Sequence, residues 1–474
     1  MPTDQLLIAP PDKPALAWYQ GLSRHQWFVL LVCSLAWLFD TMDMQLFVLS
    51  RNPAMTELLG SWAANNGINK FGGIATSFFM VGAATGGIFF GVLGDRWGRA
   101  KTMFAAIFTY SIFTGLSGFS TNWFDFSIYR LLAGIGIGGT FGAAVSLIAE
   151  TMPARSRSYA LGFMQALAAI GNMVAAGVSF LIPPSLIQHG ISGWRMIFFV
   201  GVVPAFLGAM VMRKLKEPAA WIKAKEDRLA GTSDNTQRLG SLRELFSDRQ
   251  LRRNTLVGIA LGLAGVTGLW GVGFYLPELI HTVVPKTTDN WKATADWYAS
   301  MGMLLFNAAA VLGTFALSYI MNRLGRRAGF AIIFLIAILT ITGVFGFMTK
   351  PAQVWWMAPL LGIGTLSVFG GFSIYFPELF PVRLRATGTG VCYNTARYVS
   401  ASAPLTFGML TVWLSADAGT PRSANGLASL TILSSLGSID NPIRYAAIIL
   451  ASAFIIGLAA LPFAPETKGK PLPL

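Results

Sequence analysis

Four ionisable side chains interrupt long apolar stretches of the sequence, namely Asp40, Asp43, Arg130 and Arg397. An ionised side chain in the middle of a lipid bilayer costs roughly 2.5–3.5 kcal/mol or more, so each of these groups needs a physical reason to be there. One reason is chemistry, which here means proton transfer or the binding of a charged solute. The other is structure, since a static network of salt bridges can hold helices together.

Asp40 and Asp43 are three residues apart, which places both carboxylates on one face of a helix. Two carboxylates one turn apart repel each other, and the repulsion is relieved when one of them takes up a proton. The pair is therefore a candidate proton-coupling site whose protonation would permit a change of conformation. Arg130 is the expected partner of Asp43 in one conformation, which would link the proton state to gating. A static salt bridge is the alternative.

The chain that carries these charges is too apolar for a soluble globule of 474 residues. Hydrophobic residues make up 54% and charged residues 12% of the sequence, whereas charged residues are about 25% of a typical soluble protein. Apolar runs long enough to cross ~30 Å of hydrocarbon lie at 27–49, 71–93, 102–119, 125–148, 159–182, 194–212, 254–280, 297–320, 329–348, 354–376, 388–410 and 442–463. The sequence predicts an all-α membrane protein with twelve transmembrane helices.

Two phrases occur twice, once in each group of six spans. The phrase ETMPARSR at Glu150–Arg157 recurs as ELFPVRLR at Glu378–Arg385. The phrase GDRWGR at Gly94–Arg99 recurs as MNRLGR at Met321–Arg326. The chain is therefore predicted to be a tandem duplication that forms two pseudo-symmetric six-helix bundles. Repeated bundles around a central site are a common design of secondary transporters, so the expected activity is the movement of a solute.

The first repeated turn has a structural and a mechanical interpretation. Its glycines permit a tight turn, Asp95 can cap the next helix, and the arginines are expected to stay in water or among lipid headgroups. The alternative is a gate latch, in which Asp95 pairs with a basic residue of a neighbouring helix in one conformation only. The candidate gating residues are Gly94, Asp95, Arg96, Gly98, Arg99, Glu150, Arg157, Glu378 and Arg385.

The net charge of +14 is distributed unevenly between the two sides of the predicted membrane domain. Most Lys and Arg lie in the segments on the side that would hold both termini, and such a bias sets membrane topology. We therefore expect a multi-pass protein of the plasma membrane, the inner membrane in a bacterium, with both termini cytoplasmic. No nucleic-acid partner is expected.

The expected organisation follows from the spans and this topology. It comprises an N-terminal cytoplasmic segment (1–26), a first six-helix bundle (27–212), a cytoplasmic connector (213–253), a second bundle (254–463) and a cytoplasmic tail (464–474). Within the connector, amphipathic helices are expected around Trp221–Leu229 and Leu242–Phe246, lying on the membrane surface.

The cysteines and histidines suggest no further chemistry. Cys33 and Cys392 lie in predicted spans, where small packing residues are the ordinary interpretation. The three histidines, His25, His189 and His281, lie outside the spans, which leaves no imidazole relay within the membrane and no expected metal site. We expect no cofactor besides a coupling proton, and the chain lacks the clustered nucleophile, base or metal set of a membrane-embedded enzyme.

Several motifs resemble those of the major facilitator superfamily along the length of the chain. The phrase RLLAGIGIG at Arg130–Gly138 resembles the family's fourth-helix motif, and PETKGK at Pro465–Lys470 resembles the tail of its sugar-porter and organic-ion branches. The resemblance implies the twelve-helix fold of that family. The second half departs from the pattern at Asn322, where the family often keeps Asp, and at Ala358, which lies opposite Arg130 in the repeat.

The resemblance also narrows the substrate. Asp40-Thr-Met-Asp43 resembles the first-helix motif of the aromatic acid and metabolite proton symporters, and Arg397 followed by Pro404 resembles their eleventh-helix arginine. This implies that Arg397 binds an organic anion, because a guanidinium offers a planar fork to a carboxylate. Asn394, one turn earlier, could add a hydrogen bond.

The remaining substrate-binding candidates are weaker. Trp270 and Tyr275 either stack on a ring of the substrate or pack helices. Gln165 either lines the cavity or bridges helices. The first function hypothesis is proton-coupled symport of a small organic carboxylate, aromatic, monocarboxylate or nicotinate-like. The alternatives are a sugar or polyol carrier, favoured by the tail motif, and metabolite or drug efflux by proton antiport. The two-half design allows a monomer to work alone.

Overall fold

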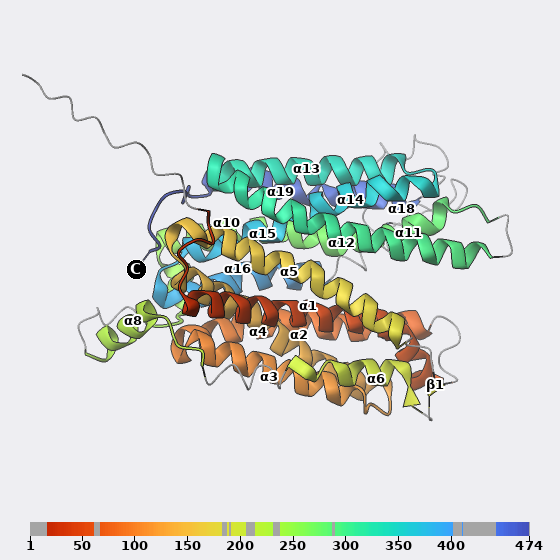
Figure 1. The fold of residues 1–474 in the computed structure, drawn as a ribbon, viewed down its shortest axis with the longest axis horizontal. Coiled ribbons are helices and arrows are strands. Elements are labelled where there is room, and N and C mark those ends of the chain that lie inside the picture. Colours follow the sequence, from red (N-terminus) through yellow and green to blue (C-terminus); the bar gives the residue numbers. More distant parts are fainter. Residues whose placement is uncertain are drawn as a thin grey trace, which may run out of the picture.

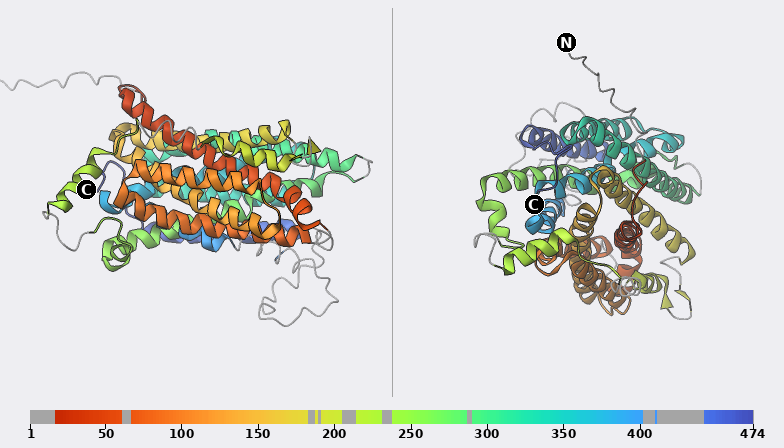
Figure 2. Two further views of the ribbon diagram at one scale, coloured as in Figure 1. Left: turned by 90° about the horizontal axis from the view of Figure 1, so that it is seen from below. Right: turned by 60° about the vertical axis from the view of Figure 1, so that its left-hand side comes forward.

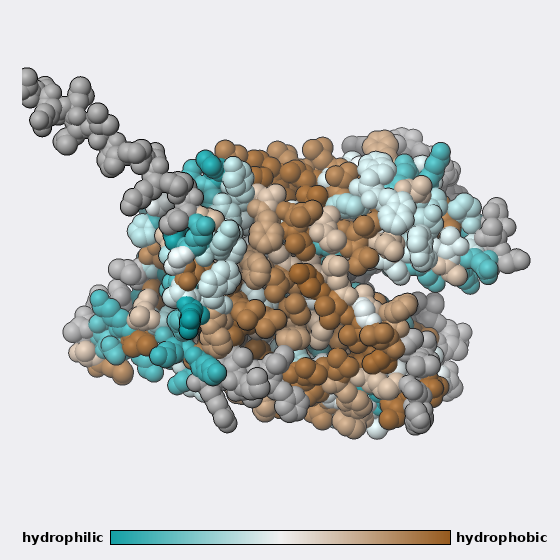
Figure 3. All heavy atoms as spheres, in the orientation of Figure 1, coloured by the Kyte–Doolittle hydropathy of each residue, from teal (hydrophilic) through white to brown (hydrophobic). Residues whose placement is uncertain are grey.

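The computed structural model is a bundle of long helices that run along its longest axis (Figure 1). It describes residues 17–60, 67–182, 187–188, 191–204, 214–230, 238–286, 290–401, 410 and 442–473. On the face drawn in Figure 3, a broad apolar band crosses the middle of the bundle, and hydrophilic residues lie toward its two ends. Among the described residues, eight helices are long and apolar enough to cross a membrane.

The helices of the first half of the chain are α1 (Arg24–Leu59), α2 (Gly67–Trp97), α3 (Arg99–Ser117), α4 (Trp123–Thr151), α5 (Ala154–Leu181) and α6 (Gly193–Val200). A two-stranded antiparallel ribbon precedes α6, with β1 (Ile187–Gln188) paired to β2 (Ile191–Ser192). We call α1 to α6 the first-half helices. In Figure 1 they form the lower part of the bundle.

The second-half helices are α10 (Arg249–Gly271), α11 (Leu276–Val283), α12 (Trp291–Leu324), α13 (Arg326–Phe347), α14 (Val354–Thr365), α15 (Val368–Tyr375), α16 (Arg385–Ser400), α18 (Pro442–Ala451) and α19 (Ala453–Ala460). Short 3₁₀ segments lie between them, at η2 (Gly273–Tyr275), η3 (Pro351–Gln353), η4 (Phe376–Leu379), η5 (Val382–Leu384) and η6 (Leu461–Phe463). Helix is present in each of the twelve predicted spans.

Two short helices, α8 (Ala219–Leu229) and α9 (Leu242–Ser247), lie between the halves in the chain, where the sequence predicts them. They lie at the same end of the bundle as the C-terminus (Figure 2), and we call this end the connector end. The β-ribbon and α11 lie at the opposite end (Figure 1). Trp221 of α8 is buried and donates a hydrogen bond from Nε1 to the Asp95 carbonyl at 2.8 Å, so α8 docks onto the α2–α3 turn.

Local sequence signals explain several helix ends. At the start of α4, Asn122 Oδ1 accepts hydrogen bonds from the N–H groups of Phe124 and Asp125 at 2.9 and 3.0 Å, in a capping box. The two repeated turns contain Gly98 and Gly325 with φ of 122° and 104°, a region that L side chains rarely adopt. The repeated glycines are therefore required by the same backbone turn in each half.

Close approach of α2 and α4 depends on small residues. A Cβ at Gly138 of α4 would lie 1.8 Å from the Ala83 carbonyl oxygen of α2, and one at Gly86 would lie 1.9 Å from the Ile135 carbonyl oxygen. Membrane helices lack a hydrophobic force between them, so such backbone contact supplies the packing energy. The glycine-rich segment that follows Arg130 thus brings this arginine into the core of the first half.

Gly138→Ala should separate α2 from α4 and lower the free energy of unfolding by about 1–3 kcal/mol, the usual range for an overpacked site. The thermal midpoint of the purified protein in detergent measures the effect. Gly343→Ala in α13 is the matched control, because a Cβ there has no heavy atom within 4 Å. This control should be neutral or stabilising by up to about 1 kcal/mol, since alanine favours helix. Equal midpoints for the two variants would contradict the packing argument.

Candidate functional site

A cavity lies between the two halves near the middle of the bundle. Its lining includes side chains from α1, α5, α10, α12, α15 and α16, namely Trp37, Thr41, Met44, Gln45, Val48, Gln165, Ala168, Asn172, Leu269, Met303, Phe306, Asn307, Leu366, Phe369, Tyr393 and Arg397. The walls are mostly apolar with a few amides and a single guanidinium. A mostly apolar pocket with a few placed polar groups is the usual form of a small-molecule site.

Arg397 provides the cation of this cavity and is almost fully buried. Its Nη1 donates a hydrogen bond to Asn394 Oδ1 at 3.2 Å, and its guanidinium lies over the Tyr393 ring, 4.7 Å from the centroid. Asn394 itself donates to the Gly390 carbonyl and is not among the lining residues. The structure therefore places Asn394 behind Arg397, where it orients the guanidinium, and leaves other N–H groups available to a bound anion.

Asp40 is fully buried and lies in the electrostatic field of Arg397, with Thr140 beside it. Within the described part of the chain, neither of its carboxylate oxygens accepts a hydrogen bond of good geometry. A buried ionised carboxylate without hydrogen bonds is costly, so protonation of Asp40 would relieve that cost.

Asp43 lies in different surroundings, although it is one turn away on the same helix. Its Oδ2 lies 3.5 Å from Nη1 of the buried Arg130. Arg130 also donates to Ser117 Oγ at 3.0 Å and Thr114 Oγ1 at 2.7 Å, both on α3. The structure thus brings Asp43 and Arg130 together, and it directs the two carboxylates of the pair to different cations, one in each half of the chain.

Amide side chains connect the two halves across the cavity. Gln165 Oε1 accepts hydrogen bonds from Trp37 Nε1 at 3.1 Å and from Ser373 Oγ of α15 at 3.2 Å. Gln165 therefore both lines the cavity and bridges helices. Asn172 of α5 donates to Asn307 Oδ1 of α12 at 2.9 Å. Asn307, Gln45 and Tyr393 were not among the residues that the sequence singled out, although each is a polar side chain in an apolar run.

Of the aromatic candidates of the seventh span, Tyr275 is not among the residues that line the cavity. Tyr275 lies in η2, toward the opposite end of the bundle, in the electrostatic field of Arg51 and Glu278. The side chain of Trp270 lies outside the described part of the chain, as does Pro404. Aromatic contact with the cavity comes instead from Trp37, Phe306, Phe369 and Tyr393.

At the connector end, Asp95 joins the two halves. Its carboxylate accepts hydrogen bonds from the N–H groups of Ala386 and Thr387 at 3.2 and 2.8 Å and from Thr387 Oγ1 at 2.6 Å. Asp95 therefore caps α16 of the second half. The expectation that it caps the next helix, α3, is wrong, because another carboxylate occupies that position.

That carboxylate is Glu217, which accepts hydrogen bonds from the N–H groups of Arg99, Ala100 and Lys101 at the start of α3, the shortest at 2.7 Å. The second half repeats the arrangement. Glu466 accepts from the N–H groups of Arg326 and Arg327 at the start of α13, at 2.9 and 3.1 Å. Glu217 and Glu466 are thus a third feature that occurs in both halves. The sequence comparison of the halves missed this feature, because a Pro next to each Glu is the one similarity between the two segments.

The expectation that the arginines of the repeated turn stay in water holds for Arg96, which is exposed, but not for Arg99, which is fully buried. Arg99 pairs with Asp95 at 3.1 Å and with Glu150 at 3.0 Å, and Glu150 also pairs with Arg385 at 3.0 Å. Burial of Arg99 is possible because two carboxylates and the Gly94 carbonyl surround its guanidinium. This network links α2, α3, α4 and α16.

The second repeat forms a different network. Arg326 pairs with Glu378 at 2.7 Å and donates to Ser158 Oγ of α5 at 3.1 Å and to Asn322 Oδ1 at 3.3 Å. Asn322 is neutral, so Arg326 has one acidic partner where Arg99 has two. Arg157, another of the predicted gating residues, donates a hydrogen bond to the Ala149 carbonyl at 2.9 Å. The two connector-end networks are related by the repeat but are not equivalent.

Comparison with known proteins agrees with this arrangement. The model of the Major Facilitator Superfamily matches residues 33–405. The chain belongs to this superfamily. It is therefore a transporter and not an enzyme, and the predicted twelve-helix fold is confirmed. As a superfamily member with many apolar helices, it is a multi-pass membrane protein.

Transporters of organic acids are among the relatives of this superfamily member. It is 29% identical over 399 residues to the cis,cis-muconate transport protein of Acinetobacter baylyi, covering 82% of this chain and 89% of the relative. It is 26% identical over 408 residues to a niacin transporter of the same organism, covering 81% and 87%. Its fold resembles the proton:xylose symporter XylE bound to 6-bromo-6-deoxy-D-glucose, with a TM-score of 0.70, 19% identity, and coverage of 94% and 98%.

Glu466→Gln should destabilise the transporter at neutral pH and have little effect in acid. Backbone N–H groups lower the pKa of Glu466 below its ordinary value of 4.5, although partial burial acts in the opposite direction. Because the folded-state pKa is lowered, the carboxylate's contribution is present above pH 4.5 and is lost as the pH falls through the folded-state value. Loss of a helix cap is worth about 1 kcal/mol.

Thermal midpoints of the wild type and Glu466→Gln, measured between pH 7 and pH 3.5, test this expectation. Glu226→Gln on α8 is the control, since this exposed glutamate caps no helix. A destabilisation by Glu466→Gln that persists unchanged at the lowest pH would show that the ionised carboxylate is not the capping species.

Proposed function

We propose that this transporter moves a small organic carboxylate together with a proton by alternating access. The observation that carries the proposal is Arg397, a buried guanidinium and the one charged side chain among the described residues that line the mostly apolar cavity between the halves. A guanidinium in such a site favours a planar carboxylate, which can accept two parallel hydrogen bonds. Cis,cis-muconate and niacin, after which two relatives are named, are both carboxylic acids.

The proton site is Asp40 in this proposal. Asp40 and the substrate carboxylate both interact with Arg397, so a bound anion weakens the attraction that keeps Asp40 ionised. Binding of the anion therefore favours protonation of Asp40, and the loaded cavity holds an electrically balanced set of charges. Asp43 and Arg130 form the neighbouring ion pair, and through this pair the protonation of Asp40 would affect the packing of α1 against α3 and α4.

The gating residues close the connector end in this proposal. Asp95 and Glu150 each bind groups of both halves, so the connector end can open only when these contacts to α16 break. The surface is notched at the opposite end between the second-half helices above and the first-half helices below (Figure 3). In this proposal the bias of basic residues orients the connector end toward the cytoplasm, and we therefore assign the structure to a state that faces outward.

A sugar or polyol carrier is the second candidate, and the amides favour it. Gln45, Gln165, Asn172 and Asn307 could bind hydroxyl groups around the cavity. The same amides also suit a hydroxylated or ring-bearing acid. A neutral sugar, however, would leave the buried Arg397 without an anionic partner from the substrate, so the carboxylate is preferred.

Arg397→Ala should abolish gradient-driven uptake of the preferred carboxylate into proteoliposomes. Loss of one partner of a buried charge pair costs about 2–5 kcal/mol, which corresponds to a roughly 30- to 4,000-fold loss of uptake. Arg397→Lys retains the positive charge but not the planar fork of the guanidinium, so its uptake should lie between that of the wild type and that of Arg397→Ala. Arg243→Ala, on the exposed face of α9, is the control. A panel of labelled carboxylates and sugars provides the substrates. The proposal would be refuted if the protein took up a sugar at a rate that depended neither on the proton gradient nor on the presence of Arg397.

Asp40→Asn should separate coupling from binding. The variant cannot release a proton, so accumulation driven by an inward proton gradient should fall at least about tenfold, which is 1.4 kcal/mol. Exchange of labelled for unlabelled substrate at equal pH should persist, because exchange needs no net proton release. Asp296→Asn, at an exposed site, is the control. If Asp40→Asn accumulates substrate normally while Asp43→Asn does not, the proton is carried by Asp43.

A further inference from the structure

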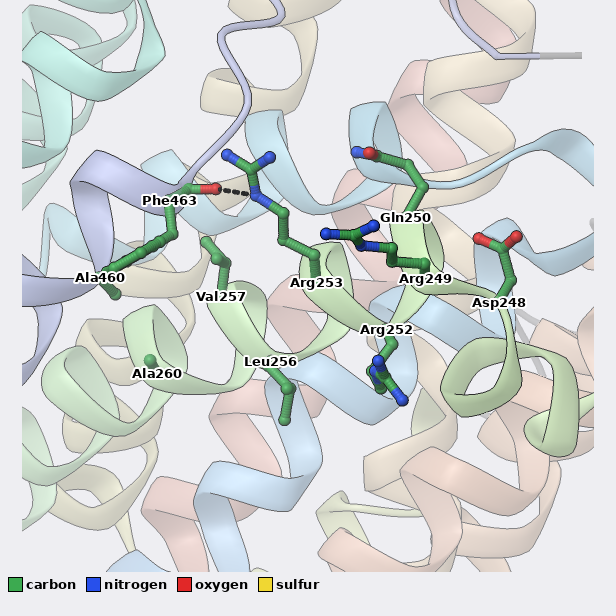
Figure 4. A pocket seen from close by; sticks show the side chains of 10 residues that line it. All are labelled: Asp248, Arg249, Gln250, Arg252, Arg253, Leu256, Val257, Ala260, Ala460 and Phe463. Carbon is green, nitrogen blue, oxygen red and sulfur yellow. Dashed lines mark hydrogen bonds between the residues drawn. The ribbon is translucent and has the colours of Figure 1, made fainter.

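A groove of about 780 Å³ lies at the connector end between the start of α10 and the end of α19 (Figure 4). Three arginines of the first turns of α10 line it, namely Arg249, Arg252 and Arg253. Apolar side chains continue the groove, with Leu256 and Val257 from α10 and Phe463 from η6. The groove is remote from the central cavity and shares no lining residue with it.

The cations of the groove have few protein partners. Arg249 and Arg252 are exposed, and their guanidinium groups form no hydrogen bond or ion pair with any residue that the structure describes. Arg253 donates from Nε to the Phe463 carbonyl at 2.9 Å, which leaves its two Nη groups without a partner in the same described set. The carboxylate of Asp248, the one acidic group of the lining, accepts from the Leu251 N–H at 2.8 Å as the helix cap.

The arrangement of these side chains is amphipathic along the helix. Figure 4 shows Arg249 and Arg253 extending side by side, while Arg252 extends from α10 beside Leu256, one turn further into the helix. Leu256 and Phe463 are 55% and 61% exposed. In a membrane protein, such apolar side chains lie against acyl chains, and arginines one turn away lie at the level of the headgroups.

We propose that this groove binds one phospholipid with a net negative headgroup. The headgroup phosphate would lie against Arg249 and the Nη groups of Arg253, Arg252 would extend along the part of the groove beside Leu256, and an acyl chain would cover Leu256 and Phe463. A free phosphate would satisfy the arginines but leave both apolar side chains in water. A lipid would interact with both the arginines and the apolar side chains of the groove, so we assign it as the occupant.

Native mass spectrometry of the purified full-length protein tests the assignment, with phosphatidylglycerol and phosphatidylcholine of identical chains as probes. The wild type should bind phosphatidylglycerol roughly tenfold more tightly than phosphatidylcholine, and Arg249→Gln/Arg252→Gln should lose this preference, because each basic residue near the surface contributes a severalfold effect. The matched control is Lys216→Gln/Lys223→Gln, which removes two exposed cations at the same end but outside the groove. It should retain the preference.

The double variant breaks no hydrogen bond of the described structure, and Arg249→Lys/Arg252→Lys, which keeps both charges, should retain most of the preference. If the glutamine variant does not fold, the single variants Arg249→Gln and Arg252→Gln provide the comparison. Equal losses in the groove and control variants would overturn the proposal, since general surface charge would then explain binding. Binding of glycerol 1-phosphate as tightly as the lipid would also overturn it in favour of a soluble phosphate site.

Discussion

The burial of charged side chains away from bulk water is the constraint on which the arrangement of this transporter depends. Arg99, Arg130 and Arg397 are buried or nearly so, and each lies beside groups from other helices. Removing one partner of a buried ion pair typically costs about 3–5 kcal/mol, so the helices that carry the partners cannot separate unless the charges are satisfied elsewhere. Conformations of the bundle are therefore tied to the pairing of a few side chains.

The clearest case is the contact between Asp95 and the start of α16. A carboxylate from the first half satisfies two backbone N–H groups and a hydroxyl of the second half. The positive end of the helix dipole adds to this attraction. The same carboxylate pairs with Arg99 of α3, which also binds Glu150 of α4, so one small cluster joins the four helices α2, α3, α4 and α16. This contact stabilises the closed connector end but involves few residues, so it can break and form again as that end opens and closes.

The duplication explains the frame of the protein but not its chemistry. Both halves contain the left-handed glycine turn and the distant glutamate that caps the following helix, Glu217 in one and Glu466 in the other. The charged side chains near the centre are not repeated. Asp40 and Asp43 belong to α1 and Arg397 to α16, so the buried acidic groups belong to one half of the chain and the guanidinium that lines the cavity belongs to the other. An asymmetric site can bind an anion on one half and a proton on the other.

The sequence by itself determined the membrane spans, the repeat and the buried charges, because apolar length and helical spacing are local properties. It also indicated that Asp43 would pair with Arg130, since few partners exist for a charge in lipid. Only the tertiary structure decided that Asp95 caps α16 and Glu217 caps α3. Asp95 and Ala386 are 291 residues apart in the chain, and no local pattern specifies a pairing between side chain and backbone over that distance. Such pairings depend on how the two halves pack.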